Sequence, residues 1–166
     1  YIVLTPGNFY EDGGFRPRPE KDRYYSGDFN SDFILNANDL IIAMTEQAPG
    51  LLGSSAIIPE DNKYLHNQRL GLVTITNDAL FDKKFLYYLF NIHSIRGQIS
   101  GSASGTKVRH TSPERIYRVE VKIPDVLIQK KIGAILSKYD DLIENNRRRI
   151  QLLEEAARLL YQEWFV

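Results

Sequence analysis

The sequence feature that most restricts the fold is a seven-residue hydrophobic repeat that runs without interruption through residues 132–164. Apolar positions recur at steps of four and three, and no proline or glycine follows Gly133. Such a repeat predicts a coiled-coil helix within residues 124–166, roughly 60 Å long at about 1.5 Å per residue. Its predicted seam comprises Ile132, Leu136, Tyr139, Ile143, Asn146, Ile150, Leu153, Ala157, Leu160 and Trp164.

The predicted helix carries more apolar surface than one seam can cover, because Leu142, Leu152 and Leu159 form a second stripe beside it. A polar residue at a seam position, such as Asn146, is typical of coiled coils that select one partner or register. We therefore expect the helix to pair with a second helix, from the same parent chain or from a second copy. The alternative is a terminal helix that folds back along its own domain.

Residues 1–123 have a different pattern. Runs of β-forming residues predict short strands at 1–4, 33–45, 56–60, 71–76 and 118–123. The helical spacing of Phe81, Phe85 and Leu89 predicts a helix over residues 81–99. Many turn residues separate these segments, so we predict an α/β (α+β), loop-rich domain over 1–123. Because the chain starts in a strand-like run without Met, we expect an upstream piece in a longer parent protein.

The composition argues against several classes of protein. Cysteine is absent, which excludes disulfides and thiolate metal sites. Lys+Arg and Asp+Glu both number 21, so bulk charge gives no sign of nucleic acid or of an anionic membrane. No apolar run approaches the roughly 20 residues of a membrane-spanning helix, and no signal peptide is visible. We expect a cytoplasmic protein with no membrane contact.

Motifs for catalysis are also missing from the sequence. The three histidines are far apart, and none has a metal-binding spacing. The loop GSASGTKV differs from a phosphate-binding P-loop, since Gly101 and Gly105 enclose three residues and Thr106 precedes Lys107. We predict no catalytic residue, no metal and no cofactor, and therefore a binding or scaffolding role.

Positive charge is concentrated in one segment of this neutral chain. Between Arg96 and Arg118 there are five basic residues and one acidic residue, Glu114. Glycines and small hydroxyl residues let the backbone approach phosphates closely, while Arg and Lys supply charge. We predict that this segment contacts a DNA backbone, the alternative being an ordinary solvated loop. The candidate residues are Ser102, Ser104, Thr106, Lys107 and Arg109.

Two earlier segments carry side chains that suit base edges. Arg16, Arg18 and Arg23 lie in the proline-stiffened stretch GFRPRPEKDRYY, and Gln68 and Arg69 follow Asn67. Arginine binds guanine bidentately in the major groove, and Asn or Gln binds adenine. Together the two segments predict a module that reads bases with loops. Gln68 and Arg69 have a second interpretation as buried structural residues.

These residues resemble those of type I restriction-modification specificity subunits. The run IPDVLIQKKIGAILSKYDD resembles the start of the family's spacer helix, although the usual double proline is Pro124-Asp125 here. FILNANDLIIAMT, LHNQRLGLV and FDKKFLYYLFN resemble earlier family segments in the right order, with Asn38 where glycine is customary. Within the spacer segment the matching positions are Pro124, Gln129, Ile132, Ile135 and Leu136.

The resemblance implies a non-catalytic subunit fragment with one target-recognition domain and one spacer helix. Its expected partners are double-stranded DNA, of which it would recognise one half of a bipartite site, and the methyltransferase subunit, with the restriction subunit as a further partner. The helix would pair in an antiparallel coiled coil with a second recognition half or a second copy. Two alternatives stay open: the recognition domain of a fused restriction-methyltransferase, and a coiled-coil adaptor that binds no DNA.

Overall fold

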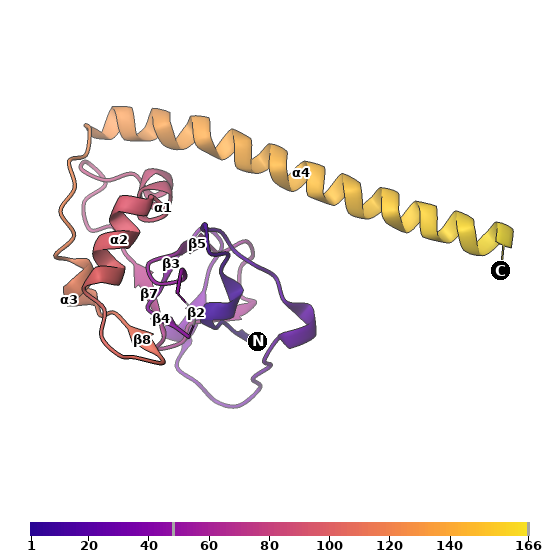
Figure 1. Cartoon of the computed structure of the whole chain (residues 1–166), viewed down its shortest axis with the longest axis horizontal. Coiled ribbons are helices and arrows are strands. Elements are labelled where there is room, and N and C mark those ends of the chain that lie inside the picture. The colour runs from indigo at the N-terminus through magenta and orange to yellow at the C-terminus, as the bar shows by residue number, and fades with distance from the viewer. Residues whose placement is uncertain (48, 166) are drawn as a thin grey trace.

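The computed structural model describes residues 1–47 and 49–165, which form a small mixed domain and one long helix (Figure 1). Helix α4 (Val126–Phe165) starts at one end of the domain and runs out past it. The predicted fold class, a loop-rich α/β domain followed by a long helix, is confirmed. Of the helices described, none is both long and apolar enough to cross a membrane.

The strands of the domain are short and belong to separate sheets. In the first sheet, β6 (Tyr64–Leu65) lies between parallel β1 (Ile2–Val3) and antiparallel β2 (Ile34–Leu35). In the second, β3 (Leu40–Ala43) lies between antiparallel β5 (Ser55–Ile57) and β7 (Leu70–Val73). The third is the antiparallel pair β4 (Thr45–Glu46) and β8 (Arg109–His110). Single 3-10 turns, η1 (Pro6–Asn8), η2 (Pro19–Lys21) and η3 (Ser31–Phe33), lie in the connecting loops.

The core of the domain is built around strand β3. Its four residues, LIIA, are all buried, as expected for a central strand covered on both faces rather than one with alternating polar positions. Burying a large apolar side chain contributes about 1.5–3 kcal/mol. This buried core stabilises the domain from which the loops extend. It comprises Ile2, Leu4, Phe9, Leu35, Ile41, Ala43, Ala56, Ile58, Tyr64 and Leu70.

The single helix predicted over residues 81–99 is wrong, because the structure has two helices there. These are α1 (Lys83–Phe90), whose N-cap Asp82 accepts the Phe85 N–H at 2.9 Å, and α2 (His93–Gly101). The break falls at Asn91, whose side-chain oxygen accepts the backbone N–H of Ser55 at 2.9 Å. Its amide nitrogen donates to the carbonyl of Tyr87 at 3.0 Å. Asn91 thus ends α1 and attaches it to strand β5.

The strand predicted at residues 118–123 is also wrong, although its alternating pattern reflects real burial. These residues, all within the described part, form no strand and connect α3 (Pro113–Ile116) to α4. Val119 and Ile123 pack against the α1–α2 cluster, while Val121 is exposed. The side-chain amide of Gln98 donates to the Glu120 carbonyl and accepts its N–H, both at 3.0 Å. A side chain therefore occupies the place that a neighbouring strand would take.

Helix α4 is fixed to the domain near its first turn by Gln129, whose exposed fraction is 0%. Its amide oxygen accepts the N–H of Asp82 at 3.0 Å. Its amide nitrogen donates to the carbonyls of Leu80 at 2.9 Å and Pro124 at 2.8 Å. One turn later, a Cβ at Gly133 would lie only 3.0 Å from the Cβ of Lys84, so glycine permits this close approach. The two residues lock the start of α4 onto α1.

Farther along, α4 turns a polar side toward the domain. The Tyr88 hydroxyl donates to Asp140 Oδ2 at 2.7 Å, and burial together with this carboxylate raises the pKa of Tyr88. The Arg147 guanidinium carbon lies 5.4 Å from the centre of the Tyr10 ring. The predicted seam is exposed from Leu136 onward, and Ile150 is 56% exposed. Contact with its own domain therefore covers Ile132 but leaves the rest of the apolar seam exposed.

Replacing Gln129 with Ala should lower the free energy of unfolding by about 2–4 kcal/mol, because it leaves buried polar groups without partners and opens a cavity. Chemical denaturation followed by circular dichroism measures this change. The matched control is Gln151→Ala, on the exposed part of the same helix, with an expected effect within about 0.5 kcal/mol. Equal losses in the two variants would contradict an anchoring role for Gln129.

Candidate nucleic-acid interface

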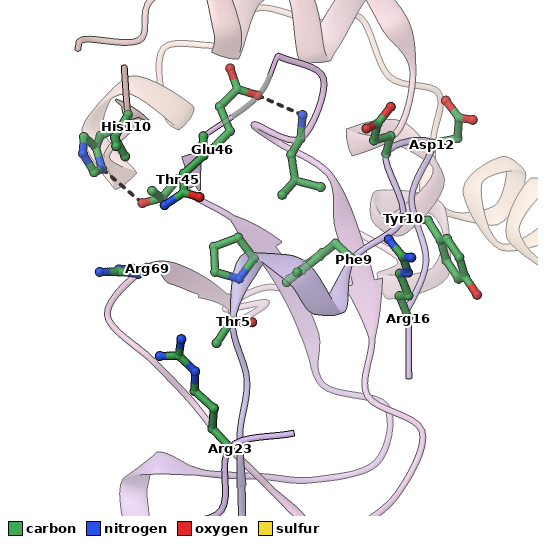
Figure 2. A pocket seen from close by; sticks show the side chains of 16 residues that line it. Thr5, Phe9, Tyr10, Asp12, Arg16, Arg23, Thr45, Glu46, Arg69 and His110 are labelled. Atoms are coloured by element: carbon green, nitrogen blue, oxygen red, sulfur yellow. Dashed lines mark hydrogen bonds between the residues drawn. The ribbon is translucent and has the colours of Figure 1, made fainter. Parts of the chain in front are cut away.

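A cleft of about 750 Å³ opens between the N-terminal loops and the β4–β8 pair. Arg16, Arg23 and Arg69 line it from separate loops (Figure 2). All three were predicted from the sequence as base-reading candidates, and the fold brings them to one place. The opposite parts of the lining come from the β4–β8 pair and from the turn that contains Tyr10.

Arg16 reaches the cleft because a tight turn reverses the chain just before it. Gly13 and Gly14 have φ angles of 97° and 100°, which residues with a Cβ rarely adopt. The Gly13 N–H donates to the Tyr10 carbonyl at 3.1 Å, and the Arg16 N–H donates to the Asn8 carbonyl at 2.8 Å. The turn places the Arg16 guanidinium carbon 5.8 Å from the centre of the Tyr10 ring.

Arg23 and Arg69 have anchored backbones and exposed side chains. The Val3 N–H donates to the Arg23 carbonyl at 2.8 Å, which aligns this loop with strand β1. The side-chain oxygen of Asn67 accepts the Arg69 N–H at 3.0 Å, and the Met44 N–H donates to the Arg69 carbonyl at 3.0 Å. Figure 2 shows the two side chains on the same side of the cleft. Loops held by backbone hydrogen bonds thus present exposed guanidinium groups.

The wall formed by β4 and β8 depends on a buried carboxylate. Glu46 is 2% exposed, and its Oε2 accepts the N–H groups of Leu51 at 2.8 Å and Leu52 at 3.0 Å. Its Oε1 accepts Nη1 of Arg109 at 2.8 Å, and Arg109 also donates to the Ser100 carbonyl. A buried carboxylate needs such partners, because desolvation disfavours an unpaired charge by several kcal/mol. Arg109, a predicted DNA contact, therefore has its guanidinium turned inward against Glu46.

The small-residue loop forms a tight hairpin with β8 at the edge of the cleft. Ser104 and His110 exchange both backbone hydrogen bonds, at 3.0 and 2.8 Å. Gly105 has a φ of 101°, and a Cβ there would lie 2.1 Å from the carbonyl oxygen of Val108. Val108 and His110 line the cleft. The other predicted contacts of the hairpin, Ser104, Thr106 and Lys107, are exposed. Ser102 is also exposed but caps the end of α2, where its hydroxyl donates to the Ile99 carbonyl at 2.9 Å.

Two other predicted residues lie elsewhere. Arg18 lines a different groove, next to α4, where its guanidinium packs against Gly7 and its Nε lies 4.0 Å from Glu20 Oε1. Gln68 is exposed beside Arg69 in the chain, so the interpretation of these two residues as buried structural groups is wrong. Arg16 and Arg18 are only two positions apart, yet they occupy separate hollows.

Several lining residues were missed from the sequence. Nδ1 of His110 lies 3.1 Å from Oγ1 of Thr45, an interaction that joins β8 to β4. Glu11 and Asp12 add carboxylates to the lining, and Figure 2 shows Asp12 on a different side of the cleft from Arg69. No short-range pattern could have identified them, because they meet only when distant segments pack together.

The lining therefore offers both hydrogen-bond donors and acceptors. Guanidinium groups donate in a planar fork, which suits phosphate oxygens and guanine edges, and carboxylates accept from exocyclic amino groups such as that of cytosine. Within residues 1–47 and 49–165, no group of three or more His, Asp or Glu side chains is arranged to hold a metal ion.

Comparisons with known proteins show which family this chain resembles. A relative, the type I restriction enzyme MjaIX specificity subunit of Methanocaldococcus jannaschii, is 31% identical over 125 residues. That match covers 75% of this chain and 28% of the subunit's length.

Two solved structures share the fold. The HsdS subunit from Thermoanaerobacter tengcongensis aligns with 98% of this chain and 41% of its own, at a TM-score of 0.60 and 16% identity. A chain from a study of complex assembly in the type I R-M system aligns with 95% of this chain and 39% of its own, at a TM-score of 0.59 and 18% identity. The chain thus spans well under half of the length of these relatives.

Residues 7–155, most of the chain, match the family described as the type I restriction modification DNA specificity domain. The matched region contains most of the domain, the three arginines of the cleft and the larger part of α4. The chain belongs to the type I restriction-modification DNA specificity family.

Proposed function

We propose that this chain is a non-catalytic DNA-recognition unit that reads one half of a bipartite site within a type I restriction-modification complex. The observation that carries the proposal is the cleft into which Arg16, Arg23 and Arg69 converge from separate loops. Loops held by a rigid scaffold are the usual carriers of binding residues. Membership of the DNA specificity family supports the same assignment.

Within the cleft, the arginines are the base-reading candidates. Each guanidinium can bond two acceptors on a guanine edge, a contact that discriminates by about 1–3 kcal/mol. Glu11 and Asp12 supply acceptors for the amino groups of cytosine. The exposed hairpin tip, with Lys107 and its small neighbours, is suited to the adjacent phosphates. Arg109, through its ion pair with Glu46, attaches this hairpin to the domain.

Helix α4 serves in this proposal as the spacer between two readers. Its polar side contacts the domain through Asp140 and Arg147, so the seam is free for an antiparallel partner helix from a second recognition half or a second copy. The helix and its partner would also carry the docking surface for the methyltransferase subunit and, beyond it, the restriction subunit. Adenine methylation and DNA cleavage would then belong to those subunits.

The test of DNA recognition is a selection from randomised duplex DNA with this chain assembled with its methyltransferase subunit. We expect a short fixed motif, with a different base position relaxed in each of Arg16→Gln, Arg23→Gln and Arg69→Gln. Arg149→Gln, on the exposed helix, changes the charge equally and should leave the motif intact. Recovery of no motif from the assembled wild-type protein would refute the proposal.

The hairpin tip should behave differently from the cleft. Lys107→Ala should weaken binding about equally for all DNA sequences and lower the slope of log affinity against log salt by about 1, as expected for one lost phosphate contact. Titration of labelled duplexes at several salt concentrations measures both quantities. An unchanged slope would show that Lys107 lies away from the DNA backbone.

Pairing through the seam is tested by Ile150→Asp, which puts a charge at a position that a partner helix would bury. Light scattering of the chain, alone and mixed with its other recognition half, should show that the variant no longer associates, while circular dichroism stays unchanged. Gln162→Asp introduces the same residue outside the seam and should associate normally. Equal masses for the wild type and Ile150→Asp would mean that the seam is not the interface.

A further inference from the structure

Tyr10 occupies the boundary between the cleft and helix α4. It lines the cleft that holds Arg16, and it also lines a second groove, of about 730 Å³, whose far wall includes Glu144, Arg147 and Gln151 of α4. Tyr10 is the first residue of the glycine-containing turn that delivers Arg16 to the cleft. One aromatic ring therefore touches both the proposed reading surface and the spacer helix.

Two guanidinium groups lie over this ring. The guanidinium carbon of Arg16 is 5.8 Å from the ring centre, and that of Arg147 is 5.4 Å from it. Both distances fall within the roughly 6 Å at which an aromatic face attracts a cation. An arginine that rests on a ring keeps its in-plane N–H groups free, so Arg16 can hold this position and still bind a base edge.

The backbone of Tyr10 is firmly held, whereas its ring is not buried. The Tyr10 N–H donates to the Gly14 carbonyl at 3.1 Å, and its own carbonyl accepts the Ser54 hydroxyl at 2.7 Å. The residue is nevertheless 37% exposed, so core packing alone does not set the orientation of the ring. The two guanidinium groups near the ring are contacts that can orient it.

The position of Arg147 is in turn set by the attachment of α4. Gln129 fixes the first turn of the helix, and the bond from the Tyr88 hydroxyl to Asp140 fixes it again, two turns before Arg147. Arg147 also directly follows the seam residue Asn146, so it flanks the surface where a partner helix would pack. These two attachments therefore fix the position of Arg147 relative to Tyr10.

We propose that Arg147 is a positioning residue for base recognition: it holds the Tyr10 ring, and the ring holds the guanidinium of Arg16. The spacer helix would then help to determine how Arg16 meets the DNA, in addition to setting the distance between half-sites. This inference rests on the proposed DNA-recognition function.

The experiment is the same selection from randomised DNA, carried out on the assembled complex with Arg147→Gln, Arg16→Gln and the double variant. Arg147→Gln should relax the base position that Arg16→Gln relaxes, by about two- to fivefold, the range expected for one partly exposed cation–π contact. Once Arg16→Gln is present, adding Arg147→Gln should cause no further relaxation at that position. Tyr10→Leu should behave like Arg147→Gln, and Tyr10→Phe, which keeps the ring, should resemble the wild type.

Arg148→Gln is the matched control, since it removes the same charge from the next residue on the exposed helix and should leave the motif intact. If Arg147→Gln and Arg148→Gln weaken binding equally and neither changes the motif, Arg147 contributes only charge and the inference is overturned while DNA recognition stands. The inference also falls if the two arginine effects add independently. If the wild-type complex selects no motif, the proposed function itself fails.

Discussion

The buried carboxylate of Glu46 is the interaction on which the candidate interface depends. It receives two backbone N–H groups from the segment after β4 and the guanidinium of Arg109 from β8, and so joins segments that are far apart in the chain. A carboxylate with an exposed fraction of 2% is tolerable only with such partners. The ion pair between Glu46 and Arg109 therefore stabilises the cleft wall and also attaches the basic hairpin to it.

A second constraint, at Gln129 and Gly133, sets the direction of α4. Because the helix is fixed near its start and touches the domain with its polar side, its apolar seam faces away from the domain. Helix α4 therefore has two separate contact surfaces, a polar one for its own domain and an apolar one for a partner. A single helix can hold its own domain in a defined orientation and still expose the apolar seam from Leu136 onward.

The features of the fold and of the candidate site that could be predicted from the sequence are those that depend on residues close together in the chain. The heptad repeat depends on residues near one another, and its long helix appears as predicted. The strand run predicted over 33–45 is divided among β2, β3 and β4, which belong to separate sheets. The helix break at Asn91 depends on Ser55, 36 residues away, and no helical pattern contains that information. The alternation in residues 118–123 identified Val119 and Ile123 as inward-facing, but Val121 is exposed and no neighbouring strand is present among the described residues. The arginines were identified as candidate DNA contacts from their residue type alone. Tertiary packing determines that Arg16 lines the cleft and Arg18 a separate groove.

A chain with no net charge gains little from general attraction to DNA, so its proposed recognition must come from the geometry of a few groups. A lone reader of this kind would bind weakly. Linking two readers makes the second binding event intramolecular, and the gain is largest when the linker matches the distance between the sites. A helix of 40 residues, fixed at its base, holds that distance far more narrowly than a flexible linker would. In the proposed function, the stiffness of α4 would compensate for modest affinity in the cleft, and the contact of Arg147 with Tyr10 would link the helix to selectivity.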